Sequence, residues 1–389
     1  MIMLPVAIVG GGPVGLFLAG CLAHLGVDCR VLEQRSGVAV HSRSIGIHAV
    51  SMDLFRRLGL SAEFLARGIQ VKRGLALDRR GRLGELNLSA SLSAFPFVLI
   101  LPQDQTERIF QEHLLSIGAA IVSRGTKFIG LRSKPGYVEI DCQDSDGRQS
   151  LVEAQFVVAC DGKRSQVRQG ARIPFLGSSY PDYFTMGDFD DNTAFGPDAA
   201  IFLPSQGLIE SFPLPGARRR WVVRLEEPVP SPEVPPARSE IESVLKRRIG
   251  HDLRGCKNYM LSRFQAERYL APVLFNGRIV LAGDAAHVVS PIGGQGLNLG
   301  WLGAWRLAGQ LSNVIRSGVD HPKAFSAYSL QQRGAARRAA RRAEMNMRLG
   351  RRRRHVSLRN ALVRVMLHSP IDRLTARLFT MQGLYSWPV

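Results

Sequence analysis

The sequence of 389 residues predicts an α/β protein, in which a mostly antiparallel sheet is inserted into a domain built on a parallel sheet. Three observations lead to this fold class. An apolar strand at residues 6–9 is followed at once by a glycine-rich turn and a helix, which is how a Rossmann-like domain begins. A buried strand of the same kind returns at residues 277–281, and the region 176–264 before it is rich in strands. This order of elements indicates an insertion rather than two consecutive domains.

The N-terminal turn has the sequence GGGPVG at residues 10–15 and leads into a helix predicted over residues 14–25. Gly10 is expected to make the tight turn, Gly12 to let the backbone approach a pyrophosphate, and Gly15 to allow close contact between helix and strand. The turn is therefore predicted to bind a dinucleotide through Gly10, Gly12, Pro13, Val14 and Gly15.

A second strand, at residues 29–32, ends in Glu33. This position lies close to 20 residues beyond the glycines, where a carboxylate accepts hydrogen bonds from ribose hydroxyls and repels a 2′-phosphate. Glu33, Gln34 and Arg35 are predicted to belong to the same site. The alternative is a glycine-rich turn that binds no ligand.

A second motif lies about 270 residues further along the chain. A strand at residues 278–282 ends in GDAAH at 283–287, and PIGGQGLN at 291–298 leads into a helix predicted over 297–311. The carboxylate of Asp284 can accept hydrogen bonds from a polyol, and the free N–H groups of the helix start can hold an electron-rich ring. Together with the N-terminal turn, this motif indicates a flavin enzyme that binds FAD.

Apolar periodicity and turn signals predict further short elements between the two motifs. They are helices over residues 49–58 and 105–117, strands within 69–100, two strands around a turn at 143–148, a strand at 155–159 and an exposed proline-rich connection at 228–236. The predicted FAD-binding domain is discontinuous and comprises residues 1–70, 101–175 and 265–330. The predicted substrate-binding sheet domain comprises residues 71–100 and 176–264, and a basic helical segment follows at 331–389.

A net charge of +19 raises the question of an anionic partner. Ten arginines lie between residues 333 and 354, and pairs of alanine and arginine alternate at near-helical spacing within 335–343. This pattern predicts a helix that packs through alanine and presents arginine to solvent. A peripheral contact with an anionic membrane, an acidic partner protein, or steering of an anionic cofactor or substrate are the alternatives. Nucleic acid is not expected, because no recognition motif accompanies the charge.

The composition is that of a globular enzyme, with 45% hydrophobic residues. The sequence lacks an apolar run of membrane-spanning length and a basic, cleavable N-terminal leader, so a cytoplasmic location is expected. Its five cysteines have no CxxC spacing, which argues against a disulfide framework and against a metal site.

Three motifs, in the same order, resemble those of the class A flavoprotein monooxygenases, the family typified by para-hydroxybenzoate hydroxylase and the aromatic polyketide hydroxylases. They are the GxGxxG turn with Glu33, the sequence DGKRSQVR at residues 161–168, and the Gly-Asp motif with its glycine-rich extension. Gln103 and Glu107 resemble the family's Gln-x-x-x-Glu at a helix start, and Arg43 resembles an arginine that contacts the flavin or its pyrophosphate.

This resemblance implies roles for individual residues. Asp284 would bind the ribityl chain of a non-covalent FAD, and the backbone around Pro291, Gly293 and Gly294 would lie beside the reactive face of the flavin as the catalytic element. Asp161 and Arg168 would lie near the cofactor entrance, with Arg168 as a candidate for the nicotinamide phosphate. The further cofactor-binding residues implied in this region are Gly283, Gly296, Leu297 and Asn298.

One departure from the family pattern is Gly303, which stands where many members carry an aspartate. His287 is expected to support the motif turn rather than to act as a catalytic base. The inserted sheet offers aromatic side chains that are compatible with a broad pocket for a flat substrate, although each is more simply explained as core. They are Tyr180, Tyr183, Phe184, Phe202, Phe212 and Trp221.

The reaction implied by the resemblance has two halves. NADPH or NADH reduces the flavin, and O₂ then forms a C4a-hydroperoxide that hydroxylates an electron-rich aromatic, phenolic or polycyclic, of secondary metabolism. A flavin-dependent halogenase is disfavoured, because none of the four tryptophans lies in a Trp-x-Trp-x-Ile-Pro segment. A family member that binds FAD without turnover, and holds or protects a reactive intermediate, is not excluded by the motifs.

Overall fold

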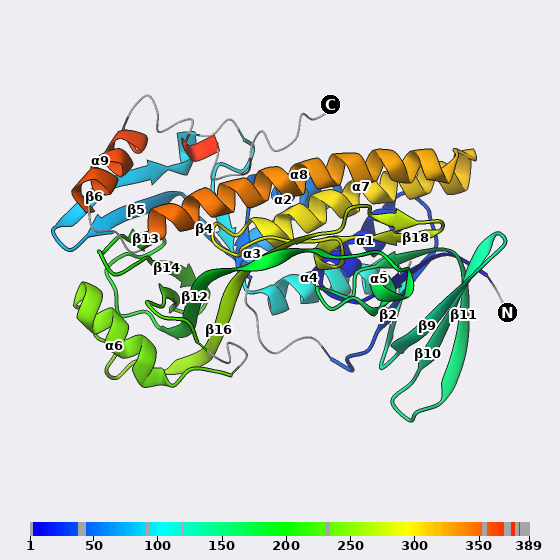
Figure 1. The fold of residues 1–389 in the computed structure, drawn as a ribbon, viewed down its shortest axis with the longest axis horizontal. Coiled ribbons are helices and arrows are strands. Elements are labelled where there is room, and N and C mark those ends of the chain that lie inside the picture. The colour runs from blue at the N-terminus through cyan, green and yellow to red at the C-terminus, as the bar shows by residue number, and fades with distance from the viewer. Residues whose placement is uncertain are drawn as a thin grey trace.

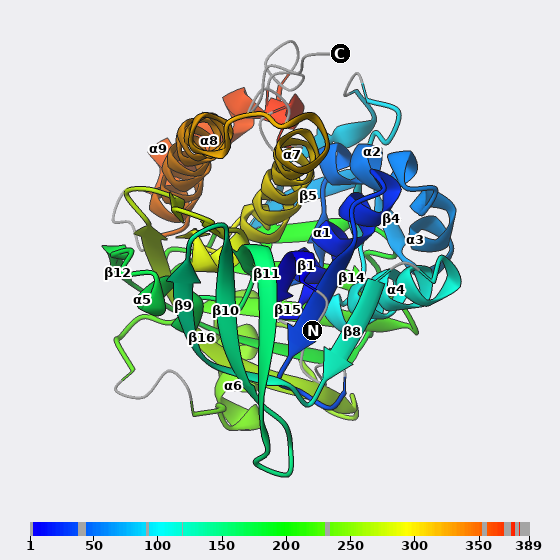
Figure 2. The same cartoon turned by 90° about the vertical axis from the view of Figure 1, so that its right-hand side faces the viewer.

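The computed structural model describes residues 3–37, 44–90, 93–118, 120–229, 234–351, 356–368, 375–377 and 381. It confirms the predicted fold class, since a parallel sheet with its helices is joined to an inserted, mostly antiparallel sheet (Figure 1). Two long helices, α7 (Gln295–Ser317) and α8 (His321–Gly350), run along the molecule (Figure 1) and lie above the parallel sheet (Figure 2). The inserted sheet and helix α6 (Arg238–Ile249) occupy the opposite end from the hairpin formed by β9 (Lys127–Lys134) and β10 (Tyr137–Gln143) (Figure 1).

The parallel sheet is built around the N-terminal strand. Strand β1 (Leu4–Val9) pairs in parallel with β2 (Cys29–Glu33) and with β11 (Gln149–Ala159). The strand that returns after the insertion is β18 (Ile279–Leu281), which pairs in parallel with β11. The carboxyl ends of β1, β2 and β18 therefore meet at one edge, which brings the glycine turn, Glu33 and the Gly-Asp motif together. The other strands of this sheet are β8 (Ala120–Arg124), β9 (Lys127–Lys134), β10 (Tyr137–Gln143) and β17 (Phe275–Asn276).

Helix α1 (Pro13–His24) packs against α4 (Gln103–Ser116) and α7 (Gln295–Ser317). Aromatic rings of these helices pack together, with the ring centroids of Phe17 and Phe110 5.5 Å apart and those of Phe110 and Trp301 6.1 Å apart. The shorter helices of this domain are α2 (Ala49–Arg57), α3 (Ser61–Arg67) and α5 (Gln166–Gly170). Helices α1, α2, α4 and α7 begin within two residues of their predicted starts.

The inserted sheet has eight strands in the order β19-β16-β12-β15-β14-β13-β5-β6. All neighbouring strands are antiparallel except β13 and β5, which are parallel. Its strands are β5 (Arg73–Asp78), β6 (Gly81–Asn87), β12 (Leu176–Asp190), β13 (Ala199–Phe202), β14 (Ile209–Leu214), β15 (Arg218–Arg224), β16 (Asn258–Leu270) and β19 (His287–Val288). A separate three-stranded sheet is formed by β3 (Gly46–Ile47), β7 (Val98–Ile100) and β4 (Ile69–Val71).

The outer face of the inserted sheet is covered by helix α6 (Arg238–Ile249), which the sequence analysis missed. Ile241 and Leu245 of this helix are fully buried against Trp221 and Ile209 of the sheet. Their spacing of four residues is a helical signal, but it lies within a region where strands dominate. Because α6 covers the outer face of the sheet, only the inner face can border a ligand-binding cavity.

Helix α8 (His321–Gly350) confirms the predicted amphipathic pattern. Ala335 and Ala339 are fully buried in the main core, whereas Arg337 and Arg341 are exposed. Helix α9 (Val356–Met366) follows, and the arginines at 352–354 lie outside the described residues. Within the described part of the chain, no helix has both the length and the apolar character needed to cross a membrane.

We expect the arginine face of α8 to serve solvation. Changing Arg337, Arg338, Arg341 and Arg342 together to glutamine should leave FAD content and NAD(P)H oxidation nearly intact. All but the half-buried Arg342 are exposed, and exposed charges interact weakly and are screened by salt. Binding to anionic liposomes, if the wild-type protein shows it, should fall in the variant.

The control for this experiment is Ala339→Arg, which places a charge on the buried face of the same helix and should reduce the amount of folded protein. A large rise in KM for NADPH but not for NADH in the fourfold variant would contradict a solvation role. It would assign the arginine face to recognition of the extra phosphate.

Candidate functional site

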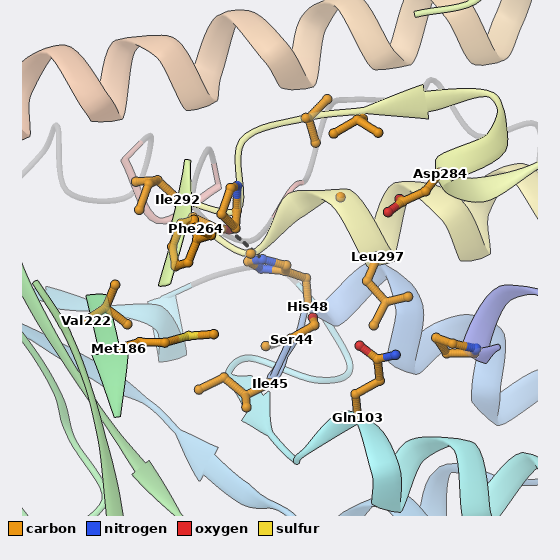
Figure 3. A pocket seen from close by; sticks show the side chains of 18 of the residues that line it. Ser44, Ile45, His48, Gln103, Met186, Val222, Phe264, Asp284, Ile292 and Leu297 are labelled. Carbon is orange, nitrogen blue, oxygen red and sulfur yellow. Dashed lines mark hydrogen bonds between the residues drawn. The ribbon is translucent and has the colours of Figure 1, made fainter. Parts of the chain in front are cut away.

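A cavity of about 1050 Å³ joins the edge of the parallel sheet to the inner face of the inserted sheet. Figure 3 shows its two halves, with Asp284 and Leu297 on one side and Met186 and Val222 on the other. His48 lies between them. The first half contains the predicted dinucleotide motifs, and the second half is largely apolar.

Steric constraints require glycine at two positions of the N-terminal turn. Gly10 has a φ of 106°, and a Cβ atom at this position would lie 2.4 Å from the carbonyl oxygen of Cys160. A Cβ at Gly15 would lie 2.0 Å from the carbonyl oxygen of Gly10, so the helix can approach the strand only without a side chain. Gly12 differs, because a Cβ there would meet nothing within 4 Å. Its bare backbone faces the cavity, as expected for a residue that lets a pyrophosphate come close.

Glu33 is held firmly at the edge of this turn. Its carboxylate accepts hydrogen bonds from the backbone N–H of Gly11, at 2.6 Å, and from the backbone and side chain of Arg35, at 2.8 and 3.0 Å. Burial alone would raise the pKa of Glu33, but the bonds from Arg35 and Gly11 outweigh it and hold the pKa below its usual value. Gln103 donates to Glu107, which lies 3.6 Å from Arg35. The carboxylate of Glu33 is therefore ionised at neutral pH and held in one orientation.

Asp284 extends into the cavity from the short 3₁₀ turn η2 (Gly283–Ala285). Its side chain is exposed to the cavity and surrounded by the protein atoms of the cavity wall. This desolvation raises the pKa of Asp284 to about 6, while Lys163 acts in the opposite direction. Hydroxyl groups that donate to the carboxylate would restore the solvation that the cavity removes.

The start of α7 forms the wall beside Asp284. Gly293 and Gly294 have φ values of 89° and 64°, and Gly294 is the N-cap of the helix. The side chain of Asn298 holds this turn, because it donates to Gly294 and accepts from Ser51 and from the backbone of His48. These bonds commit Asn298 to shaping the site, and it does not line the cavity.

His48 was not identified from the sequence. Its Nε2 atom lies 3.1 Å from the carbonyl oxygen of Gly293, so Nε2 carries the hydrogen. Burial lowers the pKa of His48 to about 4, so the ring is neutral at physiological pH. Its Nδ1 atom is buried and has no partner among the described residues. His48 thus connects the segment after β3 to the α7 turn at the middle of the cavity.

Asp161 and Arg168 lie close together but have different environments. Asp161 lines the cavity, and its Oδ1 atom is buried without a partner in the described structure, while Oδ2 accepts from Val167. Arg168 is 5% exposed, donates to the carbonyls of Ala285 and Lys163, and stacks on Phe175. The structure therefore does not place Arg168 where it could meet a nicotinamide phosphate. Lys163 and Arg164, from the same segment, line the cavity, whereas Arg168 does not.

Helix α8 explains the glycine at position 303 and the role of His287. A Cβ at Gly303 would lie 2.6 Å from Nε2 of Gln332, which donates to the carbonyl of Leu299 and lies 2.8 Å from Nε2 of His287. Burial lowers the pKa of His287 to about 4, so it accepts from Gln332 as a neutral ring. This arrangement fits the structural role expected for His287.

Most sequence-predicted site residues meet in the cavity. Those on its wall are Gly10, Gly12, Pro13, Val14, Glu33, Gln34, Arg35, Gln103, Asp161, Gly283, Asp284, Pro291, Gly293, Gly294, Gly296 and Leu297. Gly15, Arg168 and Asn298 lie behind this wall, and Arg43 lies outside the described residues.

The apolar half of the cavity is lined by different residues from those suggested by the sequence. Of the six aromatic candidates only Phe212 lines the cavity. Trp221 and Phe202 pack in the core under α6, and Tyr180, Tyr183 and Phe184 are not part of the cavity wall. The wall instead includes Met186, Val222, Phe264, Ile292 and Glu210. Strand alternation was too uncertain in the sequence to show which side chains face inward.

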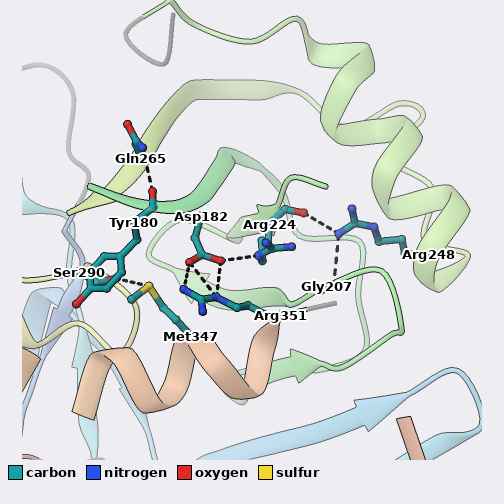
Figure 4. Close-up of polar contacts among 9 residues, drawn as sticks. All are labelled: Tyr180, Asp182, Gly207, Arg224, Arg248, Gln265, Ser290, Met347 and Arg351. Atoms are coloured by element: carbon teal, nitrogen blue, oxygen red, sulfur yellow. Dashed lines mark hydrogen bonds and ion pairs between the residues drawn. The ribbon is translucent and has the colours of Figure 1, made fainter. Parts of the chain in front are cut away.

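The end of α8 closes this half of the cavity and is anchored by a buried carboxylate (Figure 4). Asp182 of the inserted sheet is fully buried and accepts hydrogen bonds from Arg224 at 2.9 Å and from Arg351 at 2.6 Å. Burial alone would raise the pKa of Asp182, but the two arginines outweigh it and lower the pKa. Asn346 and Leu349 of the anchored helix line the cavity.

We expect Asp182→Asn to lower the free energy of unfolding by about 3 kcal/mol, because two arginines lose their buried partner. Since the folded state lowers this pKa, the stabilisation is present above the ordinary aspartate pKa and is lost as the pH falls below it. Urea unfolding at pH 7 and at acidic pH measures both effects. The control is Asp252→Asn, at an exposed pair with Arg254, which should change the free energy by less than about 1 kcal/mol. Equal effects of the two substitutions would contradict the anchoring role.

The donor set fits a bound flavin dinucleotide. A glycine turn opens its backbone to the cavity, Glu33 and Asp284 offer acceptors for hydroxyls, and Asp161 has an unpaired buried oxygen. A helix start with free N–H groups faces the same space. Fold and site together define a flavoprotein of the FAD-binding class.

The chain belongs to the FAD binding domain family, whose model matches residues 3–343. A similar curated protein is the rifampicin monooxygenase of Streptomyces venezuelae, 34% identical over 82% of this chain and 66% of its own length. The dialkyldecalin synthase of Streptomyces rugosporus is 32% identical over 86% of this chain and 70% of its own length. The resemblance to class A flavoprotein monooxygenases is thereby confirmed.

Among solved structures, p-nitrophenol 4-monooxygenase PnpA from Pseudomonas putida DLL-E4 has the same fold. It aligns with a TM-score of 0.89 at 22% identity, over 99% of both chains. The curated relatives are longer, and the chain spans 61% and 66% of the first two of them.

Proposed function

We propose that the protein is an FAD-dependent monooxygenase that hydroxylates an electron-rich aromatic molecule, using O₂ and NADH or NADPH. The main support is the continuity of the cavity. The half that suits the flavin opens, past His48 and the Pro291–Gly294 turn, directly onto an apolar sheet face. Related proteins named after rifampicin, pentachlorophenol and anhydrotetracycline also favour an aromatic substrate.

In this proposal the flavin supplies the oxygen chemistry, and the protein positions the reactants and excludes water. Asp284 binds the ribityl hydroxyls, Glu33 binds the ribose, and the start of α7 stabilises negative charge at the pyrimidine edge of the flavin. Lys163 and Arg164 replace Arg168 as the candidates that meet the phosphates of the nicotinamide cofactor, because Arg168 is buried.

The test is NADH and NADPH oxidation by the purified yellow protein, with and without polycyclic phenols. Substrate-stimulated oxidation and incorporation of one ¹⁸O atom from ¹⁸O₂ into the product would support a monooxygenase. A protein that binds FAD and consumes no NAD(P)H with any phenol would contradict the proposal.

A second candidate function rests on the similarity to the dialkyldecalin synthase. The name of this relative describes formation of a ring system rather than an oxygenation. A protein that uses its FAD-containing cavity to hold a reactive intermediate in shape would bind FAD and ligand but would not oxidise NAD(P)H. The same assay therefore separates the two functions.

A further inference from the structure

Glu210 lines the apolar half of the cavity. It belongs to β14, and its direct neighbours across the sheet are Ile201 of β13 and Val222 of β15. All three residues line the cavity. Because side chains alternate along a strand, the next residue, Ser211, faces the opposite side of the sheet. Glu210 is only 9% exposed and is aimed into the cavity.

The carboxyl group of Glu210 has no hydrogen-bond or ion-pair partner among the described residues. Arg220 lines the cavity from the same sheet face, but it donates to both oxygens of Asp188, at 2.6 and 2.8 Å. Burial raises the pKa of Glu210 to about 7, and no neighbouring charge contributes to this shift. A buried, unpaired carboxyl group destabilises a fold, so its presence on a cavity wall indicates a ligand contact.

We propose that Glu210 determines substrate specificity by accepting a hydrogen bond from a hydroxyl group on the aromatic substrate. In its ionised form it takes up that proton. The O–H bond of the substrate breaks, a new O–H bond forms on Glu210, and the electron pair left on the substrate oxygen enriches the ring. A neutral hydroxyl fits better than an ammonium group, because the wall around Glu210 is largely apolar and a cation would lose its hydration there. This inference rests on the proposed function.

Binding to the oxidised holoprotein tests the inference without turnover. The probes are 1-naphthol, its methyl ether 1-methoxynaphthalene and the cation 1-naphthylmethylammonium, each titrated while the flavin absorbance is followed. We expect 1-naphthol to bind about tenfold or more tightly than the ether, as one charge-assisted hydrogen bond allows. Glu210→Leu should remove this preference, and Glu210→Gln should retain part of it, because an amide still accepts a hydrogen bond. Glu227→Gln, at an exposed site beyond β15, is the matched control.

Thermal unfolding provides a second readout. Because the folded state raises the pKa of Glu210, wild-type stability falls as the pH rises from the ordinary glutamate pKa to about 7. Glu210→Gln should therefore melt at a higher temperature than wild type at pH 8 and at a similar temperature at pH 5. If the carboxylate had only a structural role, Glu210→Gln would melt at a lower temperature than wild type at pH 8. That result would overturn the inference.

Two binding outcomes would also overturn it. One is an unchanged preference for 1-naphthol over its ether in Glu210→Leu, and the other is tighter binding of the ammonium probe than of 1-naphthol. Holoprotein that binds FAD but none of the three probes would instead refute the aromatic-substrate proposal, and this inference with it.

Discussion

Replacing Gly10 with alanine is expected to abolish FAD uptake and to lower the free energy of unfolding by about 3 kcal/mol or more. The new Cβ would lie 2.4 Å from the carbonyl oxygen of Cys160, in the backbone of the neighbouring strand end. A flexible side chain could move away, but this backbone also donates to the carbonyl of Val9 and is part of the sheet edge. Equilibrium unfolding and flavin fluorescence titration measure the two effects.

Two matched variants separate the causes. Gly81→Ala has a similar backbone strain, with a φ of 123°, but nothing lies within 4 Å of its Cβ, so FAD binding should persist. Gly12→Ala should keep the fold, since its Cβ meets no protein atom, but should weaken FAD binding, since the methyl group occupies the path of the pyrophosphate. Normal FAD binding by Gly10→Ala would show that the turn is not the dinucleotide cradle.

The second large effect concerns Asp284. Replacing it with alanine should weaken FAD binding at least about tenfold while the fold is retained, because a carboxylate acceptor is removed from the ribityl hydroxyls, at a cost of about 1.5–3 kcal/mol. FAD binding favours the ionised carboxylate, whose pKa in the free site is about 6. The wild-type affinity should therefore be constant above this pH and fall by up to about tenfold per pH unit below it.

The alanine variant should lose this pH dependence, which distinguishes loss of the carboxylate from a general disturbance of the site. Asp146→Ala, in the exposed turn between β10 and β11, is the control and should bind FAD normally with the wild-type pH profile. An unchanged affinity of Asp284→Ala by flavin fluorescence would mean that the Gly-Asp motif does not bind the ribityl chain.

The sequence is most informative where a local steric or periodic rule determines the residue. Gly10 and Gly15 could be interpreted individually, because no other residue fits a backbone contact of 2.0–2.4 Å. The alanine face of α8 was equally clear, since its spacing matches a helix that packs closely. Helix α6 could not be recognised in this way, because its helical pattern is short and is surrounded by strands.

The roles of residues whose hydrogen-bond partners are distant in the sequence were predicted less well. Arg168 matches a family motif, but its guanidinium group is occupied by the carbonyl of Ala285, 117 residues away. Asn298 belongs to the motif at the start of α7, yet its side chain binds the segment around His48, 250 residues earlier. A motif identifies which residue types are present, whereas their partners depend on how separate segments pack.

The sequence by itself determined the fold class, the FAD-binding motifs and the amphipathic character of the basic helix, because each depends on neighbours within one turn, strand or helix. Only the tertiary structure decided which face of the inserted sheet borders the cavity, that α8 closes it through Asp182, and that Glu210 lies there unpaired. The physical reason is that burial and hydrogen-bond partners arise where distant segments meet, and strand alternation alone does not show which side will meet the flavin domain.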